Sequence, residues 1–310
     1  MRLSQLVANL APRLPDCSPD HALRGCDPEI GAVSCRAQDV KPGSLFVAIK
    51  GFTADGHDFI GQAVANGAVA VVCEQQVQTD AVTIRVDNSR KALAELAAVF
   101  YGQPSKALTV IAITGTNGKT TTSYLIESVL RSAGIAAGVI GTINYRFGGQ
   151  IFSNPVTTPE SLDLQRIMAA MRDAGVTHVV MEVSSHALDL YRVHECVFDV
   201  GVLTNFTQDH LDYHKTMEAY WACKSRLFTD VLPAAATYKH PRAVINIDDP
   251  DVRARPMSSG QARTSGSNGA DSTLKASGHG SRPPTASFPC TRTWWVVTTL
   301  KTFSMPWGWA

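Results

Sequence analysis

The chain has 310 residues, of which 45% are hydrophobic, and its formal net charge at pH 7 is +1. This length is sufficient for two domains of ordinary size, and the hydrophobic content excludes a chain that is disordered throughout. A charge so close to zero creates no broad field that would attract nucleic acid or an anionic membrane, so we expect neither partner.

The seven cysteines are odd in number, and no two of them form a C-x-x-C pair. This usage argues against a disulfide framework and a tetrahedral zinc site, and it is typical of a reducing cytosol. No apolar run reaches transmembrane length, and residues 1–15 lack the apolar stretch and cleavage site of a signal peptide. We therefore expect a cytoplasmic location.

Residues 1–107 are predicted to form an N-terminal α/β domain. Three apolar, β-branched runs have the length of strands: 45–51, 69–74 and 83–87. A short helix is expected over 58–66, ended by Gly67, and a strongly amphipathic helix over 89–100. The Gly- and Pro-containing residues 102–106 are expected to form a hinge.

Residues 108–253 are predicted to form a central α/β domain. Five apolar runs have the character of buried strands: 108–114, 138–143, 176–183, 198–204 and 243–248. Helices are expected between them over 120–133 and 160–174. This alternation predicts a mostly parallel sheet covered on both faces, with ligands at the carboxyl ends of the strands.

Residues 254–310 differ in composition from the rest of the chain. They contain one of the 27 acidic residues, Asp271, and four of the five tryptophans. Ser, Thr, Gly and Pro dominate, and no helical or strand periodicity persists. We therefore expect a frame-shifted or disordered ending, which leaves the central domain incomplete.

A glycine-rich loop lies between the strand at 108–114 and the helix that follows it, which is the context of a phosphate-binding loop. Its residues are Gly115, Thr116, Asn117, Gly118, Lys119, Thr120 and Thr121. Glycines let backbone N–H groups close on phosphate oxygens, Lys119 reaches the terminal phosphates, and the Thr120 hydroxyl ligates magnesium. The alternative is a glycine-rich turn with a surface lysine.

Glu182 ends the buried strand at 176–183, where a carboxylate is costly unless it is paired or binds a metal. We expect it to hold magnesium against the phosphates; the alternative is a solvated carboxylate at a strand end. The loop at 204–214 concentrates four further candidate metal or acid–base groups: Asp209, His210, Asp212 and His214. Taken alone, this loop could equally be a solvated polar loop.

Lys224 lies in a helical segment whose apolar residues recur at three- and four-residue spacing: Met217, Tyr220, Trp221, Leu227 and Phe228. A lysine in such a stripe either extends its amine to water or serves chemistry. Burial would lower its pKa and make a neutral, nucleophilic amine available. The residues alone leave both alternatives open.

Five motifs occur in an order that resembles the Mur ligases: GTNGKTT (115–121), NPVTTPE (154–160), MEVSSHAL (181–188), TNFTQDHLDYH (204–214) and YWACK (220–224). Residues 34–56 resemble the UDP-sugar-binding region of the same family. The resemblance covers about residues 1–252. Within the family, the chain resembles the members that add the third residue to UDP-N-acetylmuramoyl-L-alanyl-D-glutamate.

This resemblance implies ligand-binding roles for the matching residues. It assigns 115–121 to ATP, and Thr120, Glu182 and His210 to magnesium. Lys224 would carry a carbamate, formed with CO₂, that helps to hold a second magnesium. The implied catalytic residues are Lys119, Lys224 and His210.

The resemblance also implies two groups of substrate-binding residues. Those for the muramyl peptide are Thr157, Thr158, Ser184 and Arg192. Those for the uridine end are Val33, Cys35, Phe52, Thr53 and Ala54. The family usually has an aspartate and a serine where this chain has Ser34 and Cys35, and a thiol is a poorer hydrogen-bond partner than a hydroxyl.

The implied fold is a UDP-muramyl-binding α/β domain followed by a P-loop central domain. The implied function is an ATP-dependent, monomeric ligase that adds meso-diaminopimelate or L-lysine through an acyl phosphate, in peptidoglycan precursor synthesis. Family members carry a third, C-terminal domain that binds the amino acid, and we expect this chain to lack it.

Three alternatives remain at this stage. A GTPase or nucleotide kinase would share the phosphate loop, but the N-K-x-D guanine motif of a GTPase is absent from the sequence. A folate-polyglutamylating ligase would not need the UDP-sugar region. From a different class, a truncated, non-catalytic fragment would bind only nucleotide or UDP-sugar.

Overall fold

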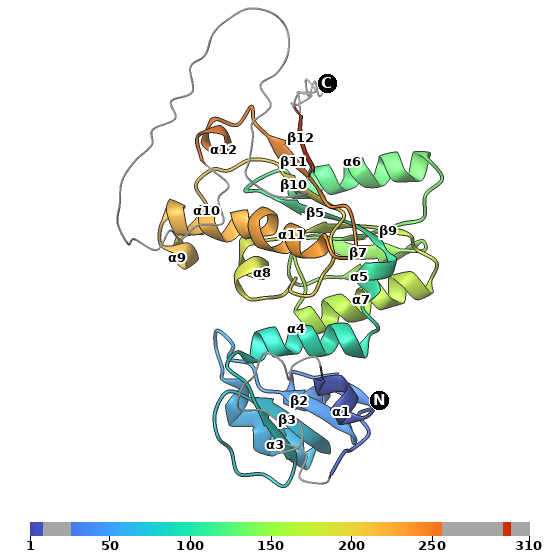
Figure 1. The fold of residues 1–310 in the computed structure, drawn as a ribbon, viewed down its shortest axis with the longest axis vertical. Coiled ribbons are helices and arrows are strands. Elements are labelled where there is room, and N and C mark those ends of the chain that lie inside the picture. The colour runs from blue at the N-terminus through green and yellow to red at the C-terminus, as the bar shows by residue number, and fades with distance from the viewer. Residues whose placement is uncertain (9–25, 256–293, 299–310) are drawn as a thin grey trace, which may run out of the picture.

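The computed structural model describes residues 1–8, 26–255 and 294–298, which form two α/β units. Figure 1 shows the smaller N-terminal unit at one end of the long axis and the larger middle unit above it, with helix α4 (Ser89–Phe100) at their junction. The predicted α/β fold with a mostly parallel sheet is confirmed. Within the described ranges, no helix combines the length and apolar character that crossing a bilayer requires.

The N-terminal unit is built on a four-stranded parallel sheet in the order β1-β2-β3-β4. Its strands are β1 (Ala32–Ser34), β2 (Ser44–Val47), β3 (Ala68–Cys73) and β4 (Val82–Arg85). Its other elements are α1 (Leu3–Val7), α3 (Ile60–Ala65), and the short 3₁₀ helices η2 (Ala37–Asp39) and η3 (Gly56–Phe59). The sequence analysis missed β1, because three residues are too few for an alternation to be visible.

Both faces of this small sheet are covered. On one face, α1 and α4 bury Leu6 and Leu93 in a cluster with strand residues such as Leu45. On the other face, Ile60 of α3 packs in a cluster with Phe46 of β2. The buried stripe of α4 explains why this helix was the clearest prediction in the first unit.

The connection to the middle unit contains more structure than the predicted hinge at 102–106. Gln103 has a φ of +49°, and the short helix α5 (Pro104–Ala107) starts directly after it with proline at its first position. The hinge prediction was therefore incomplete, because the proline that suggested a break also begins a helix well.

The middle unit contains an eight-stranded sheet in the order β12-β11-β10-β5-β9-β6-β7-β8. Its strands are β5 (Thr109–Thr114), β6 (Ala137–Ile140), β7 (Asn144–Phe147), β8 (Gln150–Ser153), β9 (His178–Glu182), β10 (Val200–Leu203), β11 (Arg242–Asn246) and β12 (Trp294–Thr298). All neighbours are parallel except the pairs β6–β7 and β7–β8. The five predicted strands are thus present.

Two features of this sheet were not predicted. The antiparallel hairpin β7–β8 was missed, although Gly148 and Gly149, with φ of +56° and +77°, supply the two-residue turn that such hairpins favour. The second is β12, which lies within the tail that we expect to be frame-shifted or disordered and which pairs with β11. Residues 256–293 and 299–310 lie outside the described residues, so that expectation stays a prediction.

The helices of the middle unit cover the two faces of its sheet. They are α6 (Lys119–Ser132), α7 (Ser161–Asp173), α8 (Ser185–Asp189), α9 (Leu211–His214), α10 (Met217–Arg226), the π-helical η4 (Leu227–Val231), α11 (Leu232–Ala235) and α12 (Pro250–Ala254). On one face, Ile126 and Leu130 of α6 pack on Val139 and Val180 of the strands.

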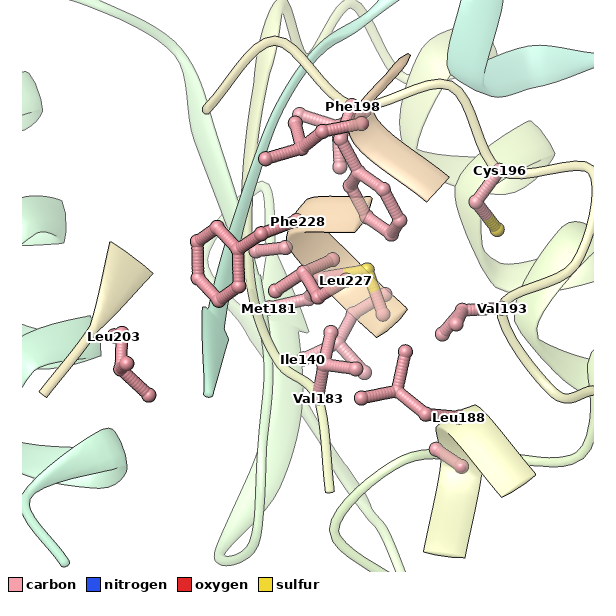
Figure 2. Close-up of a cluster of buried hydrophobic side chains, with 14 of the residues drawn as sticks. Ile140, Met181, Val183, Leu188, Val193, Cys196, Phe198, Leu203, Leu227 and Phe228 are labelled. Carbon is pink, nitrogen blue, oxygen red and sulfur yellow. The ribbon is translucent and has the colours of Figure 1, made fainter. Parts of the chain in front are cut away.

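The larger core lies on the opposite face, against α7, α8, α10 and η4. Figure 2 shows Leu227 and Phe228 next to Met181 of β9, with Ile140 of β6 beside them. All four side chains are buried. This core fixes the position of α10 on the sheet, and α10 carries Lys224.

The two units meet along α4 and α7. The guanidinium of Arg90 on α4 lies 2.8 Å from the carboxylate of Glu160, just before α7. Further along α4, Glu95 Oε1 lies 3.3 Å from His194 Nε2 of the middle unit. Leu162 of α7 packs against the core of the N-terminal unit. Polar and apolar contacts thus cross the junction together.

Leu227→Ala is expected to lower the free energy of unfolding by about 2–5 kcal/mol, because it leaves a cavity in the buried core. Leu125→Ala is the matched control, since Leu125 on α6 is 62% exposed, and it should change that free energy by less than about 0.5 kcal/mol. Urea unfolding followed by circular dichroism measures both. Equal losses in the two variants would contradict the packing of η4 on the sheet.

Candidate functional site

The predicted phosphate loop joins β5 to α6 at the carboxyl edge of the sheet. Gly115 and Gly118 have φ of +140° and +80°, which side-chain-bearing residues rarely adopt. Gly118 is also the N-cap of α6, whose 14 residues direct the positive end of a helix dipole at the loop. This geometry fits an anionic phosphate group.

Residues after β10 hold the phosphate loop in place. Thr116 N and Asn117 N donate to the main-chain and side-chain oxygens of Asn205, at 3.1 and 2.8 Å. Thr204 Oγ1 donates to Asn117 O at 2.7 Å. The loop conformation therefore depends on a segment far away in the sequence, and the Asn205 and Thr204 roles were not predicted.

Lys119 lies over its own loop. Its Nζ donates to the carbonyl oxygens of Gly115 and Thr116, at 3.0 and 2.9 Å. Burial lowers the pKa of Lys119, while the carboxylates of Glu182 and Asp209 act in the opposite direction. Lys119 is partly buried and bonded to its own loop, so it is not the surface lysine of the alternative interpretation.

Glu182 is 1% exposed, so the alternative of a solvated carboxylate is wrong. Its Oε2 accepts hydrogen bonds from Thr120 Oγ1 at 3.0 Å and Thr142 Oγ1 at 2.9 Å, and its Oε1 accepts from Thr142 N at 3.1 Å. A Cβ on Gly141 would lie 3.0 Å from the carboxyl carbon of Glu182, so only glycine leaves room for this arrangement.

These oxygens fit a hard divalent cation. The Thr120 hydroxyl and the Glu182 carboxylate already converge, and oxygen ligands are those that magnesium prefers. No lysine or arginine in the described part of the chain forms an ion pair with Glu182. Its negative charge therefore remains available at the edge of the phosphate loop.

Lys224 does not extend to water, because it is 2% exposed. Its Nζ donates to Gly115 O at 2.8 Å, the same carbonyl oxygen that Lys119 contacts, and lies 4.6 Å from the ring centre of Tyr220. Burial lowers the pKa of Lys224 to about 7, and the positive charge of Lys119 adds to the effect. A neutral amine is therefore accessible near neutral pH.

The loop at 204–214 does not bring its four candidate groups together at one point. His210 has a φ of +52° and a side chain that is 41% exposed, and its ring lies 6.0 Å from that of Tyr220. Asp209 pairs with His210 at 3.4 Å, and Asp212 is exposed. His214 is buried, and its Nε2 lies 2.9 Å from Ser185 Oγ. Within residues 26–255, the side chain of His210 contacts neither Thr120 nor Glu182.

The residues expected to bind the muramyl peptide lie next to Glu182. Thr158 is buried, and its Oγ1 donates to Glu182 O at 2.9 Å and accepts from Ser184 N at 3.1 Å. Thr157 Oγ1 lies 3.1 Å from Thr142 Oγ1. Arg192 Nη1 donates to Thr158 O at 3.1 Å. The two motifs at 154–160 and 181–188 therefore form one continuous hydrogen-bonded surface.

The residues expected at the uridine end lie on the N-terminal unit, but not all in one place. Val33 is 8% exposed in the first core, so only its main chain is available to a ligand. Cys35 is partly buried, and burial raises the pKa of its thiol to about 12. The turn at 52–54 is exposed, and Phe52 packs edge-on against Tyr213 of α9, with ring centres 6.0 Å apart.

A cleft has walls from both units. Its volume is about 400 Å³. Both Cys35 from the first unit and Arg192 from the second line it, together with Asn154 and Glu160 of the 154–160 motif. Three polar residues near the site were not singled out from the sequence: Thr142, Asn205 and Glu160. Each acts through a partner far along the chain.

Comparisons with known proteins agree with this geometry. Residues 113–284 match the Mur ligase middle domain, and residues 29–101 match the Mur ligase family, catalytic domain. The chain belongs to the Mur ligase family. Members of this family are ATP-dependent ligases.

Two curated relatives of this Mur ligase chain carry the name UDP-N-acetylmuramoyl-L-alanyl-D-glutamate–2,6-diaminopimelate ligase. The one from Geobacter metallireducens is 51% identical over 224 residues, which is 72% of this chain and 44% of the relative. The one from Bacillus cereus is 50% identical over 226 residues, which is 72% of this chain and 45% of the relative.

A solved structure of an enzyme with the same name has 30% sequence identity and a TM-score of 0.61, and the match covers 73% of this chain and 45% of the other. The chain thus spans less than half the length of the relatives that it matches.

The pKa of Lys224 predicts a pH dependence of stability. The pKa of Lys224 is about 7 in the folded chain, against 10.5 for an ordinary lysine. Between these pH values the unfolded chain binds one proton more than the folded chain. Lys224 therefore destabilises the fold most below pH 7 and progressively less towards pH 10.5. Relative to the wild type, Lys224→Met should therefore be more stable at pH 6.5 than at pH 10.

Melting temperatures in CO₂-free buffer measure this difference, and Lys41→Met, at an exposed lysine, is the control. A difference between Lys224→Met and wild type that stays constant from pH 6.5 to 10 would contradict a buried, neutralised amine.

Proposed function

We propose that this chain supplies the substrate- and nucleotide-binding parts of a ligase that adds the third amino acid to UDP-N-acetylmuramoyl-L-alanyl-D-glutamate. The observation that carries the proposal is the convergence of Lys119, Lys224 and Glu182 around the phosphate loop. A cationic amine for the phosphates and a buried carboxylate that can hold a metal ion are what phosphoryl transfer to a carboxylate needs.

In this proposal, ATP binds along residues 115–121. The backbone N–H groups of the loop and the start of α6 hold the phosphates, and Lys119 turns from the carbonyls of Gly115 and Thr116 to the phosphate oxygens. Thr120, Glu182 and His210 would hold magnesium, and a carbamate on Lys224 would help to hold a second ion. Bound there, the ions would supply positive charge that stabilises the transferring phosphoryl group.

The reaction proposed is amide formation. The γ-phosphoryl group moves from ATP to the side-chain carboxylate of D-glutamate, which makes an acyl phosphate and ADP. The amine of the incoming amino acid then attacks the acyl carbon, loses a proton and expels inorganic phosphate. The chain contributes positioning, and charge neutralisation by Lys119, to these steps.

The muramyl peptide is proposed to lie in the cleft between the units. Arg192 and Cys35 line this cleft. Arg192 is proposed to bind the peptide together with Thr157, Thr158 and Ser184, and Cys35 to meet the uridine end together with Val33 and the 52–54 turn. Direct hydrogen bonds join Thr158 to Ser184 and Arg192, which supports a single binding surface for the peptide. The amino acid added is meso-diaminopimelate or L-lysine, and the protein works as a monomer in the cytoplasm.

The second candidate is a fragment that binds nucleotide or UDP-sugar without catalysis. The short coverage of the relatives, 44–45% of their length, favours it. Incubation with MgATP, the UDP-muramyl dipeptide and either amino acid distinguishes the two. Formation of the tripeptide, seen by mass spectrometry, supports the ligase; binding of both ligands without product supports the fragment; and binding of neither contradicts both.

Lys119→Ala should weaken MgATP binding at least about tenfold, because one charge-assisted contact to phosphate contributes about 1.5–3 kcal/mol. The fold should remain, since Thr204 and Asn205 still hold the loop. Calorimetry and a circular dichroism melt measure the two properties. Lys106→Ala is the control, because Lys106 packs on the Tyr238 ring outside the loop. Undiminished affinity in Lys119→Ala would exclude the phosphate-loop role.

Where the unsubstituted chain ligates, Lys224→Ala should abolish that activity. Acetate should restore part of it, because its carboxylate can occupy the position of the carbamate. Lys119→Ala should not respond to acetate, because the lost group there is a cation. Initial rates of phosphate release, with and without acetate, measure the rescue. Equal acetate responses in the two variants would rule out a carbamate on Lys224.

A further inference from the structure

One carboxylate oxygen lies between two guanidinium groups that come from different units. Glu160 Oε2 is 2.8 Å from Arg90 Nη1 of the N-terminal unit and 3.6 Å from Arg192 Nε of the middle unit. The three side chains are only 14–16% exposed. Glu160 and Arg192 line the cleft, so this charge arrangement borders the proposed muramyl-peptide site.

The Arg90 side of this arrangement reaches the exposed turn of the first unit. Arg90 Nη2 donates to Lys50 O at 2.9 Å, and Lys50 directly precedes the turn that contains Phe52, Thr53 and Ala54. The turn itself is closed by a hydrogen bond from Gly51 N to Ala54 O at 2.9 Å. The position of Arg90 thus influences where the turn begins.

The Arg192 side reaches the centre of the middle unit. Arg192 Nη1 donates to Thr158 O, and Thr158 in turn bonds Glu182 and Ser184. Arg192 Nε is buried and has no hydrogen-bond partner among the described residues, so the ion pair with Glu160 is what compensates it. Without the Glu160 carboxylate, the buried charge of Arg192 would destabilise the fold, and the guanidinium would adopt another orientation.

We infer that Glu160 is a positioning residue that couples the two halves of the muramyl-peptide site, holding Arg192 through one contact and the 51–54 turn through Arg90. The inference rests on the proposed function for the identity of the ligand. It assigns Glu160 no contact with the reacting atoms: its effect is on affinity for the UDP-muramyl dipeptide and on the order of the turn.

Glu160→Gln removes the negative charge of the side chain and keeps its size and shape. Glu160 Oε1 accepts from Ser161 N at 3.1 Å as the cap of α7, and the glutamine oxygen can keep that bond. The variant should bind UDP-N-acetylmuramoyl-L-alanyl-D-glutamate at least about tenfold more weakly, as for truncation of a shielded charge pair, with MgATP affinity unchanged. Calorimetry measures both affinities.

Hydrogen exchange of residues 50–56 provides a readout that needs no ligand. The amides of Gly51 and Gly56, bonded to Ala54 O and Ile49 O, should exchange faster in Glu160→Gln. Glu95→Gln is the matched control, because Glu95 also bridges the units, through His194, but does not line the cleft. It should leave the exchange of 50–56 and the dipeptide affinity within about twofold of wild type.

The outcomes separate this inference from the proposed function. If wild type binds the dipeptide and Glu160→Gln binds equally well, the inference is overturned while the function stands. If wild type does not bind the dipeptide, the proposed function fails, and hydrogen exchange alone tests the coupling. Faster exchange of residues 50–56 in Glu160→Gln but not in Glu95→Gln supports the coupling. Unchanged exchange in Glu160→Gln overturns it. Equal effects of the two variants would reduce Glu160 to a general contact between units and overturn it as well.

Discussion

Two lysine side chains from different helices donate to the same main-chain oxygen, that of Gly115. Two ammonium groups this close repel each other, and burial adds to the cost of both charges. The structure relieves the cost by lowering the pKa of Lys224 to about 7 and by placing the carboxylate of Glu182 nearby. An anion entering the phosphate loop would relieve it further, so the arrangement is prepared for a polyanionic ligand before one arrives.

The rest of the middle unit serves to hold these groups at one edge of the sheet. The side chain of Glu182 has room only because position 141 is glycine, and it is oriented by Thr120 and Thr142. The buried face of α10 and η4 fixes Lys224 in the same way. Parallel strands bring their carboxyl ends together, and the polar residues after β5, β6, β9 and β10 therefore meet although the chain separates them widely.

The N-terminal unit is not independent of this edge. Its helix α4 carries Arg90 and Glu95, which form charged or hydrogen-bonded contacts with the middle unit. Leu162 in return packs into the first core. Because the cleft has walls from both units, small changes in their relative position change its shape. The ion pair between Glu160 and Arg90 therefore joins a wall of the cleft to the N-terminal unit.

The sequence by itself predicted the main strands and helices of both units, the phosphate loop at 115–121, the roles expected of Glu182 and Lys224, and the resemblance to the Mur ligases. These are local patterns, in which neighbours along the chain carry the signal. Only the tertiary structure decided that Lys224 is buried against Gly115, that Thr142 and Asn205 orient the site, and that Glu160 lies between two arginines. Burial and ion pairing depend on side chains brought together from distant parts of the chain. No periodicity within one segment contains that information, and for the same reason the short strands β1 and β12 were invisible before the sheets were assembled.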